Sequence, residues 1–185
     1  MGVTGLLGGA FDPPHDGHVA LARTAKERFD LDRLVVMVVA EPGHKRVATP
    51  ADVRVRLAHA AFPDDEVVLE REPYTVDAVR DDRYRDALFV IGADEFCDFP
   101  TWKDPDGVLE SVRLAVATRP GYPRGRIESV LATLRRPERV QFFEIPDVPV
   151  ASRDVRARLA AGEPPDGLVP PPVARLIEEL ALYRD

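Results

Sequence analysis

Two glycines and two histidines lie close together near the start of the chain, in the stretch G-G-A-F-D-P-P-H-D-G-H that covers residues 8–18. The stretch follows an apolar run and precedes a segment of helical character, so it marks a junction between a strand and a helix. Adjacent glycines let a ligand approach the backbone without meeting a Cβ atom. The N–H groups that begin a helix favour phosphate. This pattern therefore predicts chemistry on a phosphorylated ligand.

His15 and His18 are three residues apart, so both can lie on one face at the mouth of the helix. A zinc site would usually need a third and a fourth ligand. No cysteine or acidic pair nearby completes such a set, because Asp12 and Asp16 are better explained as turn and helix-cap residues. We therefore expect no metal ligand among the residues of the protein.

The composition limits the classes of function. The chain has 185 residues, of which 45% are hydrophobic and 31% charged, as in a globular protein with a sizeable core. The net charge of −7 argues against general binding of nucleic acid, and no apolar run is long enough for a membrane span. The N-terminal residues show no basic region ahead of an apolar segment, so we expect no secretory signal, and Cys97, the single cysteine, is expected to be a small buried side chain. We expect a cytoplasmic protein that binds neither nucleic acid nor membrane.

Apolar runs alternate with helical patterns along the chain. Strands are expected at residues 3–7, 34–40, 66–70, 88–92, 113–118 and 140–145, and helices at 17–29, 50–61, 75–81, 125–135, 152–161 and 171–183. This alternation predicts an α/β fold, a doubly wound, Rossmann-like parallel sheet with helices on both faces. We expect one domain over residues 1–185, with a C-terminal helical portion at about 151–185 packed on it.

The predicted strands end in residues suited to a nucleotide. Gly8-Gly9, Gly43-His44-Lys45, Gly92-Ala93-Asp94 and Arg119-Pro120-Gly121 each follow a strand. In this architecture those turns meet at one edge of the sheet. Glycines, cations and one acid would then share a cleft.

On these residues the chain resembles the nucleotidyltransferases with an HxGH motif, and within them the bacterial nicotinate-nucleotide adenylyltransferases. The signature G-G-x-F-D-P-x-H-x-G-H is present at residues 8–18. Further matching stretches are residues 43–45, 73–77, 92–96, 100–103, 168–170 and 173–183, so the resemblance spans nearly the whole chain. One motif departs, because the family pattern I-S-S-T-x-x-R reads V-A-S-R-D-V-R at residues 150–156.

The resemblance implies transfer of AMP from ATP to nicotinate mononucleotide, giving deamido-NAD and pyrophosphate in NAD biosynthesis. It implies catalytic roles for His15, His18, Lys45 and Arg156. It implies an ATP site made of Gly8, Gly9, Phe11, His15, His18, Gly92, Asp94, Ser152, Arg153 and Arg156. It implies a mononucleotide site made of Thr75, Trp102, Lys45 and Arg119. Mg²⁺ is expected to arrive with ATP, since it keeps waters and phosphate ligands.

Several of these residues have a plainer explanation. Trp102 alone would be assigned to core packing, but its place beside Thr101 and Lys103 favours stacking on the nicotinate ring. Asp94 can both cap a helix and bind ribose. Arg119 is equally well explained as a contact for the mononucleotide phosphate and as a solvated charge at a strand end.

Other functions remain open on the sequence. A sister enzyme could use nicotinamide mononucleotide or phosphopantetheine, or could transfer a cytidylyl group, although phosphopantetheine enzymes usually have Thr in place of the first histidine. A nucleotide-binding module without catalysis is favoured only by the altered 150–156 motif, and both retained histidines argue against it. A dinucleotide-binding oxidoreductase fits poorly, because G-x-G-x-x-G is missing after the first strand.

Overall fold

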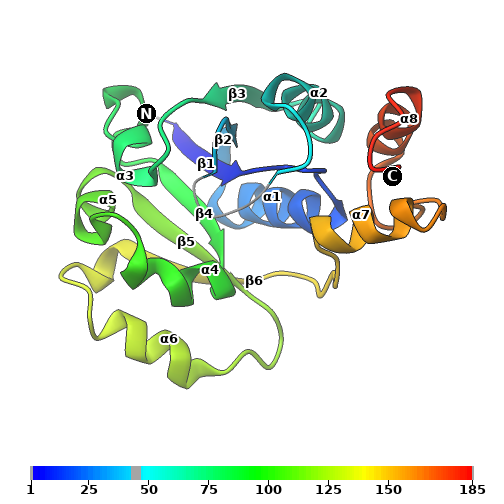
Figure 1. Cartoon of the computed structure of the whole chain (residues 1–185). Coiled ribbons are helices and arrows are strands. Elements are labelled where there is room, and N and C mark those ends of the chain that lie inside the picture. The colour runs from blue at the N-terminus through cyan, green and yellow to red at the C-terminus, as the bar shows by residue number, and fades with distance from the viewer. Residues whose placement is uncertain (1, 43–46, 185) are drawn as a thin grey trace.

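The fold is built on one six-stranded sheet, in a computed structural model that describes residues 2–42 and 47–184 (Figure 1). Its strands are β1 (Val3–Gly9), β2 (Leu31–Val39), β3 (Glu66–Glu70), β4 (Leu88–Gly92), β5 (Arg113–Thr118) and β6 (Val140–Glu144). All neighbouring strands pair in parallel, in the order β3-β2-β1-β4-β5-β6. The order reverses between β1 and β4, which is where such sheets bind ligands. The predicted doubly wound parallel sheet is confirmed.

Helices cover both faces of this sheet (Figure 1). They are α1 (Asp16–Phe29), α2 (Ala51–Ala61), α3 (Thr75–Ala78), α4 (Ala93–Asp98), α5 (Pro105–Ser111), α6 (Arg124–Leu131), α7 (Ser152–Ala160) and α8 (Pro171–Glu179), with 3₁₀ turns at Asp82–Tyr84, Phe99–Thr101 and Pro137–Arg139. Buried side chains of α3, α4, α5 and α6 form one core with the sheet, and those of α1, α2, α7 and α8 form the other.

Alternate residues of the central strands belong to the two cores. Leu6 of β1 lies in the first core and Leu7 in the second, and Val35 and Val36 of β2 divide in the same way. A parallel strand covered on both faces needs apolar residues at nearly every position. This requirement explains why β2, β4 and β5 stand out as apolar runs in the sequence.

Several predicted element ends are wrong by a few residues. The glycine pair that was expected to form a turn continues β1 as far as Gly9. Helix α1 begins at Asp16, and its N-cap is His15, not Asp16. Helix α3 begins at Thr75, as predicted, with Tyr74 as its N-cap, but it ends at Ala78 and not at residue 81.

The last helix is shorter than its apolar pattern indicates. Helix α8 ends at Glu179, whereas the predicted helix runs to Tyr183. Beyond it, Ala181 and Tyr183 have φ angles of 49° and 61°, in the left-handed region that ends a helix. Helices α4 and α5 were missed, since six and seven residues hold too few turns for a helical period to be visible.

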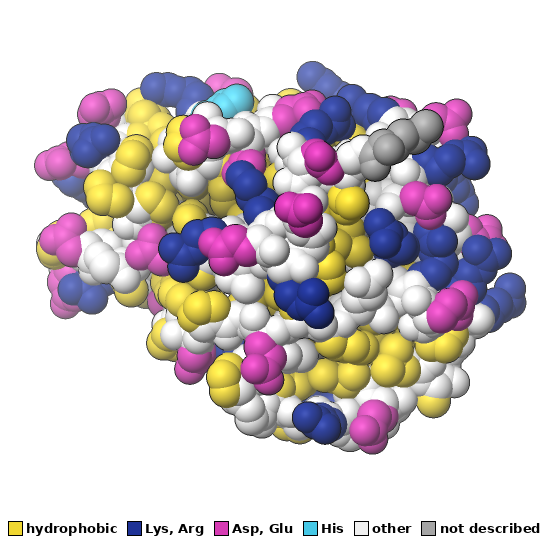
Figure 2. Space-filling view, turned by 180° about the vertical axis from the view of Figure 1, so that it is seen from behind, with side chains coloured by type: hydrophobic (Ala, Val, Ile, Leu, Met, Phe, Trp, Pro, Cys, Tyr) yellow, Lys and Arg dark blue, Asp and Glu magenta, His cyan; other side chains and the backbone are white. Residues whose placement is uncertain are grey.

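The surface carries charges of both signs. Figure 2 shows acidic and basic side chains close together on the face opposite to the view of Figure 1, with apolar side chains between them. Within the described ranges, no helix has both the length and the apolar character that crossing a membrane requires.

Candidate active site

The topology brings most of the predicted site residues to the carboxyl edge of the sheet. His15 and His18 follow β1, Thr75 follows β3, Asp94 and Trp102 follow β4, Arg119 follows β5, and Ser152, Arg153 and Arg156 follow β6. The carboxyl ends of parallel strands share one edge, so these residues start from the same side of the sheet. Lys45, predicted after β2, lies outside the described residues.

The two histidines pack directly against each other at the start of α1. Their rings are stacked, with centroids 3.7 Å apart. The backbone N–H of His15 donates to Nδ1 of His18 at 3.2 Å. Nδ1 of His18 is therefore an acceptor, and in the neutral ring the proton lies on Nε2. The spacing that predicted one shared face does bring the side chains together.

His15 is nearly buried, with 9% of its surface exposed. Its Nδ1 atom has no hydrogen-bond partner among the described residues. Burial lowers the pKa of its imidazole from 6.5 to about 4, and the Asp154 carboxylate opposes this effect. A buried polar atom without a partner costs free energy, and a ligand that paired with Nδ1 of His15 would remove this cost.

The glycine pair is required by neighbouring aromatic rings. A Cβ atom on Gly8 would lie 3.1 Å from the ring of Phe89, and one on Gly9 would lie 3.1 Å from the ring of Phe11. Phe11 is itself buried and lies 5.0 Å from the His18 ring, centroid to centroid. Gly9 therefore leaves room for the ring that packs against His18, and close approach of a ligand to the backbone of the two glycines stays a prediction.

Asp12 is more than the turn residue that the sequence indicates. Its side chain is buried, and Oδ2 accepts a hydrogen bond from the Ala48 N–H at 2.6 Å while Oδ1 accepts one from the Tyr183 hydroxyl at 2.8 Å. Its carbonyl oxygen accepts one from Nη1 of Arg156 at 2.6 Å. Three distant segments thus meet at Asp12. Tyr183 was missed as a site residue, and the only sequence signal for it was the family match of the tail.

Arg54 of α2 is a second residue that sequence reasoning missed. It is 1% exposed, and its guanidinium donates to four carbonyl oxygens, those of Thr49, Ala10, Val39 and Ala40, at 2.7 to 3.0 Å. These carbonyls belong to the last residue of β2 and to the segments that follow β1 and β2. Arg54 therefore fastens together two of the loops at the carboxyl edge. A charged residue on the buried side of α2 was the signal that could have found it.

The altered motif at the start of α7 divides into two parts. Ser152 donates its hydroxyl to the Pro13 carbonyl at 2.9 Å, and Arg156 reaches Asp12 as described. Both residues that match the family pattern therefore contact the histidine-containing loop. Arg153, which departs from the pattern, has 83% of its side chain exposed and lies 3.4 Å from the carboxylate of Asp154. The structure thus brings Ser152 and Arg156 to the loop that precedes the histidines and leaves the side chain of Arg153 largely in solvent.

Asp94 lies in the first turn of α4 and is exposed. The hydroxyl of Tyr122 donates to its Oδ1 atom at 3.0 Å and lies 3.4 Å from Sγ of Cys97, which is only partly buried. Burial raises the pKa of the Tyr122 hydroxyl, and its hydrogen bonds to Cys97 and Asp94 add to this, so Tyr122 remains a donor. A Cβ atom on Gly92 would meet nothing within 4 Å, so there is open space beside Gly92, two residues before Asp94.

Two of the residues predicted for the mononucleotide, Thr75 and Trp102, lie in segments that an ion pair joins. Nζ of Lys103, the neighbour of Trp102, is 2.7 Å from Oδ2 of Asp77 in α3, the helix that Thr75 begins. Trp102 is half-buried and makes edge-to-face contacts with Phe99 and Phe89 of the core.

Arg119, in the turn after β5, is half-exposed and lies 3.6 Å from the carboxylate of Asp147. This exposure fits both explanations that the sequence left open for it.

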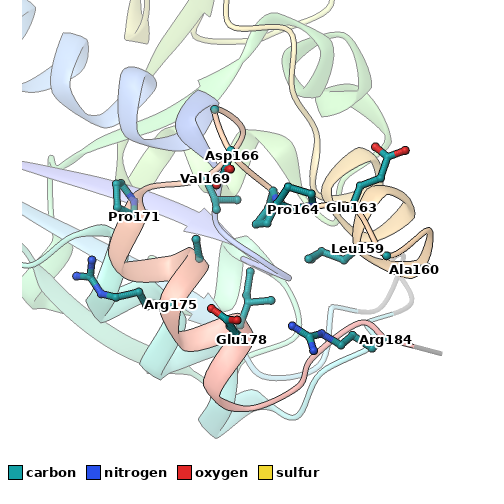
Figure 3. A pocket seen from close by; sticks show the side chains of 15 residues that line it. Leu159, Ala160, Glu163, Pro164, Asp166, Val169, Pro171, Arg175, Glu178 and Arg184 are labelled. Carbon is teal, nitrogen blue, oxygen red and sulfur yellow. The ribbon is translucent and has the colours of Figure 1, made fainter.

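A cavity of about 740 Å³ lies elsewhere, between the C-terminal end of α7 and helix α8 (Figure 3). Its lining contains none of the predicted site residues. We place the candidate site at the histidines, where the orphaned Nδ1 atom and the converging strand ends lie. Within the described part of the chain, no group of three or more His, Cys, Asp or Glu side chains is arranged to hold a metal ion.

The family model described as cytidylyltransferase-like matches residues 6–158, which include the histidine pair and the start of α7. The chain belongs to this family. Relatives that are similar over the full length include the probable nicotinate-nucleotide adenylyltransferase of Bordetella pertussis, 39% identical with 100% of each chain covered. That of Symbiobacterium thermophilum is 37% identical, with 99% of this chain and 96% of the relative covered. The resemblance inferred from the sequence is confirmed.

A solved structure agrees with the cytidylyltransferase-like fold. Nicotinic acid mononucleotide adenylyltransferase of Plasmodium falciparum, complexed with NaAD, superposes with a TM-score of 0.78. The match covers 99% of this chain and 98% of that one at 16% sequence identity, a level that establishes the shared fold alone.

Proposed function

We propose that this protein transfers AMP from ATP to nicotinate mononucleotide, releasing pyrophosphate and forming deamido-NAD. The observation that carries the proposal is the stacked pair His15 and His18 at the start of α1, beside the point where the strand order reverses. The full-length similarity to nicotinate-nucleotide adenylyltransferases supports the choice of acceptor. A cytoplasmic location fits this role and stays a prediction.

The reaction needs positioning and charge stabilisation more than proton transfer. An oxygen of the mononucleotide phosphate attacks the α-phosphorus of ATP in line, and the bond from that phosphorus to the β-phosphate bridging oxygen breaks. The attacking phosphate is already an anion at neutral pH, so no general base is required. The low pKa of His15 agrees with this, because a neutral imidazole there serves as a hydrogen-bonding group.

In the ATP half of the site, His15, His18 and Arg156 would contact phosphate oxygens. One nitrogen of Arg156 already holds the Asp12 carbonyl, so phosphate would use the other two. Asp94 would bind the ribose hydroxyls in the open space beside Gly92. Gly8, Gly9, Phe11 and Ser152 would shape the loop, and Lys45 and Arg153 would add positive charge. Mg²⁺ enters as part of the MgATP substrate.

In the mononucleotide half, Trp102 would stack on the nicotinate ring and Arg119 would contact the phosphate. Backbone N–H groups at Thr75 would receive the nicotinate carboxylate. Donors at the start of a helix favour an acid over a neutral amide, which gives a physical reason for nicotinate over nicotinamide. The ion pair between Asp77 and Lys103 would keep the two segments at a fixed separation.

The experiment is to measure pyrophosphate release from MgATP with nicotinate mononucleotide, nicotinamide mononucleotide and phosphopantetheine in parallel. We expect fast release with nicotinate mononucleotide alone. Release with another acceptor would support the transferase activity and would show that nicotinate mononucleotide is the wrong acceptor. ATP binding without release in any of the three would favour a nucleotide-binding module without catalysis.

A variant tests the role of the histidines. His18→Ala should lower turnover by about two orders of magnitude or more, because it removes a donor to the transition-state charge. Its thermal unfolding should stay cooperative. Near-normal turnover in the folded variant would contradict the proposed mechanism.

A further inference from the structure

The C-terminal end of the chain reaches the loop that carries the histidines. The hydroxyl of Tyr183 donates to the Asp12 carboxylate at 2.8 Å, across 171 residues of sequence. The loop is also held from α7 by Ser152 and Arg156, and the N–H of Asp16 donates to the Leu168 carbonyl at 2.9 Å. Tyr183 is the one member of this set whose hydrogen bond ends on a charged side chain of the loop.

Asp12 connects that hydrogen bond to the phosphate-binding residues. Its carboxylate is 2% exposed, and a buried charge of this kind needs donors on both oxygens. The Tyr183 hydroxyl donates a hydrogen bond to Oδ1, and the N–H of Ala48 donates one to Oδ2. Nη1 of Arg156 lies 3.9 Å from the same Oδ2 and 2.6 Å from the Asp12 carbonyl. A rotation of the carboxylate would therefore move the charged Oδ2 atom beside Arg156, while the Asp12 carbonyl that Arg156 binds stays in place.

The backbone is bent so that the phenol can reach Asp12. Ala181 and Tyr183 both have positive φ angles, 49° and 61°, which residues other than glycine adopt at a cost. Such strained positions persist only where the surrounding structure holds them, and they gather at functional sites. The tail is also fixed by the N–H of Leu182, which donates to the Ile177 carbonyl at 3.0 Å.

Burial also keeps Tyr183 in the form that can donate. Burial is the largest of the effects that raise the pKa of the Tyr183 hydroxyl, and the negative charge of Asp12 raises it as well. The hydroxyl therefore remains protonated around neutral pH. It cannot act as a base there, which leaves the role of a fixed donor to Asp12.

We propose that Tyr183 is a positioning residue of the ATP site, which orients Asp12 and through it Arg156 and the segment at Ala48. The inference rests on the proposed function only in taking Arg156 as a phosphate ligand. It assigns to the last residues of the chain a part in nucleotide binding that neither the HxGH motif nor the family model at residues 6–158 includes.

Tyr183→Phe removes the hydroxyl and keeps the ring. We expect the dissociation constant of ATP, measured by calorimetry, to rise about tenfold, the change expected when one hydrogen bond to a charged group is lost. The kcat/KM for ATP should fall by a similar factor, while KM for nicotinate mononucleotide stays within about twofold. If Tyr183 served stability alone, the substitution would lower the midpoint of thermal unfolding, and it would not weaken ATP binding more than mononucleotide binding.

Asp12→Asn provides the second arm of the test. If Tyr183 acts through Asp12, adding Tyr183→Phe to the Asp12→Asn protein should weaken ATP binding little further, because coupled residues are not additive. Two controls match the substitution. Tyr84→Phe removes a buried hydroxyl that has no hydrogen-bond partner among the described residues, and Arg184→Ala alters the next residue of the tail, whose side chain lines the cavity of Figure 3.

Both controls should bind ATP as the unaltered protein does. Unchanged ATP affinity in folded Tyr183→Phe would overturn the proposal, and so would a full additional loss on the Asp12→Asn background. Calorimetry with ATP needs no acceptor. The inference about Tyr183 is therefore tested even if nicotinate mononucleotide proves to be the wrong substrate.

Discussion

His15 makes the stability of the fold depend on pH in a direction that can be worked out. Burial lowers the pKa of its imidazole from 6.5 to about 4 in the folded protein, while the unfolded chain keeps the ordinary value. Between these two values the unfolded chain binds a proton that the folded chain does not. The free energy of unfolding therefore falls as the pH falls. The contribution of His15 is fully present above pH 6.5 and is lost towards pH 4.

The size of the effect follows from the same two pKa values. Each unit of pH between them lowers the free energy of unfolding by about 1.4 kcal/mol. The whole interval is therefore worth about 3 kcal/mol, and the loss on going from about pH 7.5 to about pH 5 is about 2 kcal/mol. His15 is nearly buried, so solvent screening reduces this value little. Such a loss is a substantial part of the stability of an ordinary domain, which is about 5–15 kcal/mol.

Urea unfolding at the two pH values measures the effect. His15→Gln removes the titrating ring. When the pH is lowered from about 7.5 to about 5, the free energy of unfolding of the variant should therefore decrease less than that of the unaltered protein, and the difference should be about 2 kcal/mol. His59→Gln is the matched control, because His59 lies exposed on α2 and its ring stays in water when the chain folds. It should keep the full pH dependence. The same pH dependence in all three proteins would refute the reasoning.

Three further substitutions test individual contacts. Tyr122→Phe removes the hydroxyl that orients Asp94. In steady-state assays KM for ATP should therefore rise about fivefold, while KM for the mononucleotide stays unchanged. An equal rise in both KM values would argue against a contact between Asp94 and the ribose. Trp102→Ala should raise mainly the KM for the mononucleotide, and an effect confined to ATP would show that the stacking assignment is wrong. Arg54→Lys keeps the charge but loses the planar guanidinium that binds four carbonyl oxygens. Urea unfolding should show that the free energy of unfolding falls by about 3 kcal/mol. A fall of less than about 1 kcal/mol would contradict the role of Arg54 in holding the two loops together.

The parts of the fold that could be predicted from the sequence are those where one local pattern decides the structure. Strands β2, β4 and β5 are buried on both faces, so their runs of apolar residues are visible without knowledge of their neighbours. The histidine spacing likewise lies within one turn of a helix. Helices α4 and α5 were not predictable in this way, because they are short and α4 begins at Gly92-Ala93-Asp94, a sequence that is equally typical of a turn.

The contacts that organise the site could not be predicted, because they join residues far apart in the chain. Asp12 meets partners 36, 144 and 171 positions away, and the packing of α7 and α8 on the sheet brings the last two to it. An aspartate before a proline is explained locally as a turn residue. Similarly, the position of Arg54 on the buried side of α2 marks it as unusual, but the carbonyls that it binds are known only once its helix is placed over the ends of β1 and β2.

The charges around the histidines explain how a chain with a net charge of −7 can hold a triphosphate. Arg54 and Arg156 carry permanent positive charge, and the carboxylate of Asp12 offsets one of the two. His15 adds nothing to this sum at neutral pH, because its pKa is about 4. On the proposed function, bound phosphates would favour the charged form of His15, since an adjacent negative charge raises the pKa of an imidazole. The arginines therefore supply the constant part of the positive charge, and His15 supplies the part that depends on the ligand.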